Sequence, residues 1–329
     1  MNGLIQPGGL WVYCEQGPDG IRPVVFELLG QATRLAAAMK CAVTGVLLGG
    51  TGSQASDLAQ AGADTVLCVE DASLVAADEL RHTGELAALV QQYRPAALLL
   101  GATAFGRSLA PRLAARLGTG LTADCTQLDI DPETGLLLQT RPAFGGNLMA
   151  TIVCPNGRPQ MATVRPRVFT APRRDPSRAC RIVTERSAAT GSPIELLGRV
   201  TLGAEAAIGD ADVLVAVGQG IGSAENIALA ERLAKKLGGA LAASRPMVDS
   251  GLVPYVRQVG QTGKTVSPRL YIALGISGAI QHMAGVAAQT IVAVNTDPDA
   301  PIFQYAHYAV RCDCGAFLRE MLDRIEEGE

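Results

Sequence analysis

The segment at residues 270–285 combines a candidate anion site with a side chain that could do chemistry. It begins as an apolar run, turns at residues 276–278 and continues into a pattern that predicts a helix over residues 279–288, with Gln281 and His282 near its start. Free N–H groups at a helix N-terminus bind phosphate. A histidine in the first turn would meet whatever is joined to that phosphate. The segment therefore predicts a dinucleotide site.

Composition excludes several classes of protein. Of 329 residues, 48% are apolar and 18% charged, and the net charge of -3 gives no polyanion-binding signal, so no nucleic acid partner is expected. The first 20 residues lack a basic segment followed by an apolar one, and no apolar run reaches membrane-spanning length. The eight cysteines lack zinc or iron–sulfur spacing and are typical of free thiols in a reducing compartment. We expect a cytoplasmic protein without a signal peptide, membrane insertion or a metal site.

The first half alternates between strand and helix patterns. Strands are predicted at residues 10–14, 42–48, 65–69 and 96–100, and helices at 24–39, 54–61, 85–93 and 104–117. Such alternation favours a parallel sheet covered on both faces. Short extended runs at 136–140, 147–154 and 159–164 then predict antiparallel hairpins.

A polar stretch rich in proline and glycine, at residues 173–193, predicts a linker between domains at 1–190 and 191–329. The second half alternates again, with strands at 213–217, 240–243, 270–274 and 290–294, an extended run at 308–311, and helices at 223–237, 279–288 and 315–326. The predicted fold class is α/β, with two domains that each contain a mainly parallel sheet flanked by helices. The C-terminal domain is predicted to be a dinucleotide-binding doubly wound fold.

The first turn of the second half, Gly218-Gln219-Gly220-Ile221-Gly222-Ser223, is similar to the dinucleotide fingerprint. The third fingerprint glycine is Ser223, and no acidic residue follows about twenty residues later to hold a ribose. The second strand ends instead in Ser244-Arg245. A tight turn with Ser223 as a helix N-cap therefore stays open beside cofactor contact.

Other polar residues follow the remaining strands, and each also has a structural interpretation. Thr262 lies in a glycine-flanked loop that could be a surface turn, and His282 could be a hydrogen-bonded core histidine. Asn295 could belong to a polar turn, and Asp313 could be an N-cap. Because the carboxyl ends of parallel strands meet at one edge of a sheet, their convergence favours a site there.

Together these segments resemble the α subunits of the electron-transfer flavoproteins. The resemblance rests on Ser244-Arg245, on residues 259–263 and 270–285, on residues 291–295, and on Asp297-Pro298 with residues 300–303. It is weaker at residues 104–106, and residues 141–147 (Arg-Pro-Ala-Phe-Gly-Gly-Asn) resemble versions from anaerobic bacteria. Gln219 departs from the arginine of many relatives.

The resemblance implies an FAD in the C-terminal domain and an N-terminal domain that contacts a β subunit, which completes a heterodimer. Such a protein shuttles electrons, one at a time, from a flavin dehydrogenase, here of the acyl-CoA type, to a downstream acceptor, and is a carrier rather than an enzyme. Two alternatives stay open. One is the α subunit of an NADH-oxidising bifurcating complex with a second FAD in the β subunit, and the other is a nucleotide-binding regulatory subunit without redox work.

Carried over by position, the resemblance places Arg245 beside the isoalloxazine ring, Thr262 near its N5 and His282 at the pyrimidine carbonyl. The full set of cofactor contacts that it implies is Gly220, Ser244, Arg245, Gln261, Thr262, Gly263, Ser277, Gly278, Ala279, Gln281, His282, Asn295 and Asp313.

Overall fold

The computed structural model describes residues 8–18, 20–75, 78–143, 148–188, 191–195, 197–198, 208–209 and 211–327. The chain divides into two compact units, Met1–Gly198 and Arg199–Glu329. The sequence predicts the domain boundary between residues 190 and 191. Residues 189 and 190 lie outside the described ranges. Both units are α/β with a parallel main sheet, so the predicted fold class is confirmed.

The first unit is built on a seven-stranded sheet in the order β12-β5-β4-β1-β6-β11-β7, in which every pair of neighbours is parallel. Its strands are β1 (Leu10–Tyr13), β4 (Val43–Leu48), β5 (Thr65–Val69), β6 (Ala97–Gly101), β7 (Leu121–Cys125), β11 (Gln160–Val164) and β12 (Arg181–Glu185). The central strands are buried along their whole length, because helices cover both faces of the sheet.

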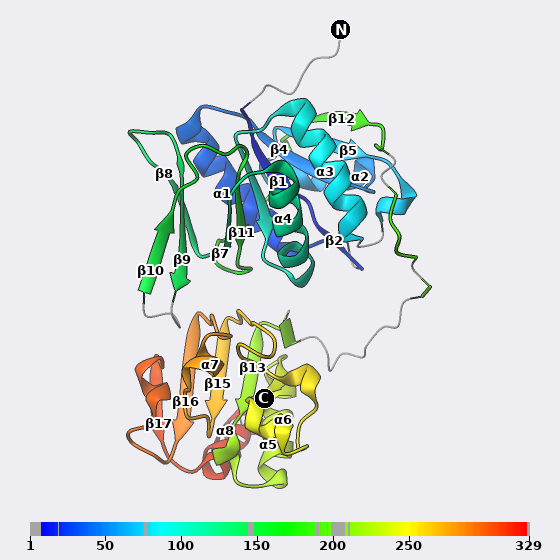
Figure 1. Ribbon diagram of the computed structural model, residues 1–329. Coiled ribbons are helices and arrows are strands. Elements are labelled where there is room, and N and C mark those ends of the chain that lie inside the picture. Colours follow the sequence, from blue (N-terminus) through cyan, green and yellow to red (C-terminus); the bar gives the residue numbers. More distant parts are fainter. Residues whose placement is uncertain are drawn as a thin grey trace. The chain divides into compact units, whose positions relative to one another are not determined.

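Four helices provide that cover (Figure 1). Helices α1 (Pro23–Met39) and α2 (Gly52–Gln60) pack on one face, and α3 (Glu79–Tyr93) and α4 (Ala104–Leu117) on the other. Helix α3 begins earlier than the sequence predicts, because the Asp78 carboxylate caps it by accepting from the N–H groups of Leu80 and Arg81. A short turn η1 (Ala72–Leu74) and a small ladder of β2 (Gln16–Gly17) with β3 (Gly20–Ile21) complete this part.

The prediction of antiparallel hairpins is correct for two of the three extended runs, at 136–140 and 147–154, and wrong for the third, at 159–164. Strands β8 (Gln127–Ile130), β9 (Leu137–Ala143) and β10 (Leu148–Ile152) form an antiparallel sheet. Strand β11 instead lies between β6 and β7 and is parallel to both, with every residue buried. Strand β12 lies inside the predicted linker and extends the edge of the main sheet beside β5.

The second unit contains a five-stranded parallel sheet in the order β14-β13-β15-β16-β17. Its strands are β13 (Val213–Val217), β14 (Ala240–Ala243), β15 (Leu270–Leu274), β16 (Thr290–Asn295) and β17 (Tyr308–Arg311), close to the predicted ranges. Strand β13, the first of the unit in sequence, lies in the sheet between the next two strands, β14 and β15. The chain therefore leaves β13 toward one side and returns on the other, which creates a topological switch point.

The two faces of this sheet are covered differently (Figure 1). The long helices α5 (Ala224–Lys236) and α8 (Cys314–Glu327) pack on one face. The other face is covered mainly by the loop residues Val259 and Val266, by Ile302 of a short turn, and by Met283 of α7 (Ile280–Met283). The unit also has α6 (Arg245–Asp249) and the short turns η4 (Gln219–Ile221), η5 (Tyr255–Arg257) and η6 (Pro301–Gln304).

The ten-residue helix predicted at 279–288 is wrong in length, because α7 has four residues. Within the described residues, no helix is both long enough and apolar enough to cross a membrane. The same residues contain no cluster of histidine, cysteine, aspartate and glutamate suited to a metal ion.

Candidate functional site

The carboxyl ends of the five parallel strands bring the expected site residues to one edge of the second unit's sheet. Gly220 follows β13, Ser244 and Arg245 follow β14, and the turn at residues 277–279 follows β15. Asn295 ends β16, and Asp313 follows β17. Open α/β sheets bind ligands at this edge, beside the switch point. The edge is thus the candidate site.

Glycines at the switch point let two loops approach each other more closely than any side chain would allow. The N–H of Gly220 donates to the carbonyl oxygen of Gly275 over 2.9 Å. A Cβ on Gly218 would lie 2.4 Å from that oxygen, and a Cβ on Gly275 would lie 2.3 Å from the carbonyl carbon of Gly220. Gly275 also has φ +62, which side chains rarely adopt. The turns after β13 and β15 therefore form one backbone-lined floor.

A second close approach brings the loop at residues 260–263 against α7. The N–H of Gln261 donates to the carbonyl oxygen of Gln281 over 2.7 Å. A Cβ on Gly285 would lie 2.5 Å from the Cα of Gly260. The side chains of Gln261, Thr262 and Gln281 are exposed, so three polar groups stand together at this place.

His282 is buried, and both of its ring nitrogens have partners within the protein. Nδ1 lies 3.1 Å from the carbonyl oxygen of Val259, and Nε2 lies 2.8 Å from the hydroxyl of Tyr271. A carbonyl only accepts, so Nδ1 carries a proton. Burial lowers the pKa of His282 to about 4, so the ring is neutral at pH 7 and Nε2 accepts from Tyr271. The structure shows the hydrogen-bonded histidine that the sequence left as an alternative, and contact with a cofactor stays a prediction.

The phosphate site predicted from a helix N-terminus is not supported. Helix α7 has four residues and no side-chain cap, which is too short for an aligned row of peptide dipoles. The turn before it packs instead against η6, because the N–H of Ile302 donates to the carbonyl oxygen of Ser277 over 2.9 Å. Gly278 has φ +90, and a Cβ there would lie 2.3 Å from the nitrogen of Ile302. The exposed Ser277 hydroxyl and Ala279 remain at the edge.

Arg245 is a cation at this edge. Its side chain is 65% exposed, and its Nε lies 3.3 Å from Oδ2 of Asp249, while its two Nη atoms have no partner among the described residues. Ser244 before it is buried, and its N–H donates to the carbonyl oxygen of Val217. Arg245 can therefore offer a planar pair of donors to an anionic group at the surface.

Three further residues have structural roles that the sequence left open. Ser223 Oγ accepts from the N–H of Asn226, so it caps α5. Asp313 Oδ1 accepts from the N–H of Ala316 over 2.9 Å, which caps α8. Asn295 donates from Nδ2 to the carbonyl oxygen of Ile276 and accepts at Oδ1 from the N–H of Asp297. Asp313 Oδ2 has no hydrogen-bond partner among the described residues.

Comparison with known proteins gives the family. Residues 10–190 match the electron transfer flavoprotein domain, and residues 207–287 match the electron transfer flavoprotein FAD-binding domain. The electron transfer flavoprotein subunit alpha of Thermoanaerobacterium thermosaccharolyticum is 45% identical over 97% of this chain and 98% of its own. Protein FixB of Clostridium saccharobutylicum is 44% identical over 97% and 96%. The acryloyl-CoA reductase electron transfer subunit beta of Anaerotignum propionicum is 40% identical over 97% and 96%.

The chain belongs to the electron transfer flavoprotein family. It is similar to the α subunits of these carriers along almost its whole length, and its cofactor is FAD. The protein thus carries electrons and is not an enzyme in the ordinary sense.

The residues at the candidate site fit a flavin nucleotide. The close-packed glycines bring the turns after β13 and β15 together at this edge without side chains between them. The Arg245 guanidinium and the exposed polar groups of Gln261, Thr262 and Gln281 can each donate a hydrogen bond. An electron transfer flavoprotein needs such donors because FAD carries phosphates and ring acceptors.

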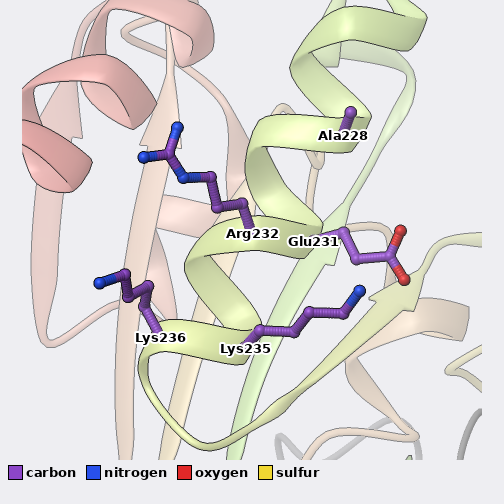
Figure 2. A pocket seen from close by; sticks show the side chains of 5 residues that line it. All are labelled: Ala228, Glu231, Arg232, Lys235 and Lys236. Carbon is purple, nitrogen blue, oxygen red and sulfur yellow. The ribbon is translucent and has the colours of Figure 1, made fainter.

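A separate hollow lies on the outer face of α5, at its C-terminal half (Figure 2). It has a volume of about 440 Å³ and is lined by Ala228, Glu231, Arg232, Lys235 and Lys236. Lys236 ends α5 just before β14 begins, so the hollow is toward the amino ends of the strands, away from the candidate site. Its position gives no support for binding the cofactor of this family.

Two side chains that contact site residues were missed from the sequence, Gln258 and Tyr271. Gln258 Nε2 donates to Thr262 Oγ1 over 3.0 Å, and Tyr271 bonds His282. Gln258 lies four residues before Thr262 and next to the glycine-flanked loop, which is the one signal that could have suggested it. Tyr271 reads as an ordinary strand residue, and its pairing with His282 depends on the fold of the intervening turn.

Proposed function

We propose that this chain forms a heterodimer with an electron transfer flavoprotein β subunit, and that the FAD at the edge of its five-stranded sheet takes electrons from a flavin dehydrogenase and passes them to a downstream acceptor. FAD supplies the redox chemistry when bound. The chain's own residues bind it, orient it and set the energy of the charge that reduction adds. The N-terminal unit is proposed to contact the β subunit.

One observation carries the proposal. Five strand ends bring a partly unpaired guanidinium, a close-packed glycine floor and exposed hydrogen-bond donors to the same edge. A fixed cation beside a group that gains negative charge lowers the energy of the charged form. Thr262 is proposed to contact the ring, Gln261 the ring or ribityl chain, and Ser277 and Gln281 the ribityl–pyrophosphate part, as the resemblance implies. The resemblance places Ser244, Asn295 and Asp313 on the pyrophosphate and adenosine side. The proposed set also includes Gly220, Gly263, Gly278 and Ala279.

His282 takes a narrower role than the resemblance implies. With Nδ1–H donated to Val259 and Nε2 occupied by Tyr271, the ring has no N–H for a pyrimidine carbonyl. Contact at that carbonyl would require Tyr271 to release Nε2 and the ring to gain a proton. We therefore propose that His282 supports the loop at residues 259–262, and that Arg245 and Thr262 are the principal donors to the ring.

An acyl-CoA type of dehydrogenase is proposed as the electron donor. The relative from Anaerotignum propionicum is named as the electron transfer subunit of an acryloyl-CoA reductase, so that protein works with an enzyme whose substrate is a CoA thioester. Its 40% identity over 97% of this chain supports a partner of the same chemical class here.

The second candidate is an α subunit of a bifurcating complex that oxidises NADH and has a second FAD in the β subunit. The observation in its favour is the resemblance of residues 141–147 to versions from anaerobic bacteria. Residues 141–143 end β9, and residues 144–147 lie outside the described residues.

The experiment that separates the two uses the complex with its β subunit under anaerobic conditions. A reduced acyl-CoA dehydrogenase and NADH are offered separately, and bleaching of the flavin absorbance is followed. Bleaching by the dehydrogenase alone supports the simple carrier, whereas rapid bleaching by NADH of a complex with two FAD supports bifurcation. A complex with flavin that neither donor reduces would contradict both, and would favour a regulatory nucleotide-binding subunit.

Removal of the Arg245 cation should change the potential of the cofactor more than the stability of the fold. Arg245→Ala is expected to lower the one-electron midpoint potential of bound FAD, by about 40 mV for each kcal/mol of lost charge stabilisation. The free energy of unfolding should change by less than ~0.5 kcal/mol, because the side chain is exposed. Spectroelectrochemical titration gives the potential. Arg269→Ala, an exposed arginine before β15 at the opposite edge, should leave it unchanged.

A further inference from the structure

The loop that presents Thr262 is closed by main-chain and side-chain hydrogen bonds. The N–H of Gly263 donates to the carbonyl oxygen of Gly260 over 3.0 Å. The N–H of Lys264 donates to the carbonyl oxygen of Gln258 over 2.8 Å. The Tyr255 hydroxyl donates to the main-chain carbonyl of Thr262 over 3.0 Å. These bonds fix the Thr262 backbone. Whether the Thr262 hydroxyl donates or accepts a hydrogen bond at the surface therefore depends on its partner within the loop.

That partner is Gln258. This side chain is 3% exposed, and its Nε2 donates to Thr262 Oγ1 over 3.0 Å. Gly263 keeps the approach open, because a Cβ there would lie 2.9 Å from the Gln258 Cγ and 2.4 Å from its main-chain oxygen. A buried amide therefore reaches an exposed hydroxyl along a path that only glycine permits.

The direction of this hydrogen bond determines the direction of the next one. A threonine hydroxyl has one proton to donate and two lone pairs that accept. Because Thr262 Oγ1 accepts the hydrogen bond from Gln258, the hydroxyl proton of Thr262 is not donated to Gln258. The described residues contain no acceptor for that proton. The hydroxyl proton therefore remains available for donation to a ligand.

We propose that Gln258 is a positioning residue for the flavin site: its buried amide orients the Thr262 hydroxyl so that the O–H is donated to a ring acceptor of FAD. The inference rests on the proposed placement of FAD at this edge. Gln258 does not itself contact FAD. Its role is to make the Thr262 hydroxyl the donor, rather than the acceptor, of one hydrogen bond to the ring.

The test is a double-mutant cycle in the complex with the β subunit, with FAD affinity and midpoint potential as readouts. Gln258→Met keeps the length of the side chain and removes the donor, and Thr262→Ala removes the hydroxyl. Each is expected to raise the FAD dissociation constant by up to ~10-fold, the loss of about one hydrogen bond. Each should also shift the potential in the same direction. The double variant should match the single variants, because both substitutions act on the same O–H donation: one removes the hydroxyl and the other its orientation.

Additive effects in the double variant, or a Thr262→Ala shift that Gln258→Met does not share, would overturn the inference. So would a Thr262→Ala variant whose affinity and potential equal those of the wild type. Should Gln258→Met fail to fold, Gln258→Asn keeps an amide that is one methylene too short and gives the same comparison. Gln289→Met, at an exposed position before β16, is the matched control and should change neither readout. A wild-type complex without FAD would refute the proposed function itself, which distinguishes that failure from failure of the cycle.

Discussion

Gly275→Ala is expected to unfold or severely loosen the second unit and to abolish retention of FAD. The substitution places a Cβ 2.3 Å from the carbonyl carbon of Gly220, at a residue with φ +62. The left-handed backbone costs about 1–2 kcal/mol and the overlap about 1–3 kcal/mol more. The two turns that form the floor of the site would have to move apart. Urea unfolding followed by circular dichroism, together with the FAD content of the purified complex, measures both consequences.

Gly238→Ala is the matched control for backbone strain. Gly238 has φ +66, nearly the same as Gly275, and a Cβ there would have no neighbour within 4 Å. It should lose only about 1 kcal/mol and keep its FAD. If Gly275→Ala behaves like Gly238→Ala, the close approach of the two turns does not matter for the site.

The stability of the second unit should fall as the pH drops from about 6.5 to about 4. Burial lowers the pKa of His282 from 6.5 to about 4 in the folded chain, so the unfolded chain binds a proton first as the pH falls. The contribution is fully present above pH 6.5 and is lost at about pH 4, with a total of ~3 kcal/mol. Urea midpoints of the full chain measured at intervals between pH 4 and 8 would show it.

A variant that cannot titrate isolates this effect from that of the acidic side chains. His282→Gln retains an amide N–H for Val259 and an oxygen that can accept from Tyr271, without a proton to gain in this range. The difference between the two pH profiles should therefore grow below pH 6.5. Parallel profiles would mean that His282 is not held neutral by burial.

The second unit could be predicted in detail because its pattern is local. Strands β13, β14 and β15 are short apolar runs bounded by glycine or polar residues, and site residues follow each of them directly. Parallel pairing then brings those ends together without further information. The sequence therefore predicts the edge at which Arg245, Asn295 and Asp313 gather.

The errors arose where long-range pairing decides the structure. Strand β11 resembles the hairpin strands that precede it, yet all five of its residues are buried between β6 and β7. Strand β12 contains only three consecutive β-branched residues, Ile182, Val183 and Thr184, and they lie within a polar segment. The helix predicted after β15 ends after one turn because Gly285 must lie against Gly260.

The state of His282 also depended on contacts that no local pattern shows. Its partners Tyr271 and Val259 are 11 and 23 residues away in sequence and belong to a strand and a loop. Only the folded unit shows that both ring nitrogens are occupied. Gln258 was missed for a similar reason. The sequence does not show which group a loop amide contacts, and its hydrogen bond to Thr262 is seen only in the folded loop.

The binding of FAD at the edge of the five-stranded sheet is tested by the flavin content and visible spectrum of this chain co-purified with its β subunit, in the wild type and in Gly275→Ala. We expect one FAD for each copy of this chain in the wild type, and loss of that FAD in the variant. Absence of flavin from a correctly folded wild-type complex would contradict the claim. Full retention by Gly275→Ala would contradict the location of the cofactor at this edge of the sheet.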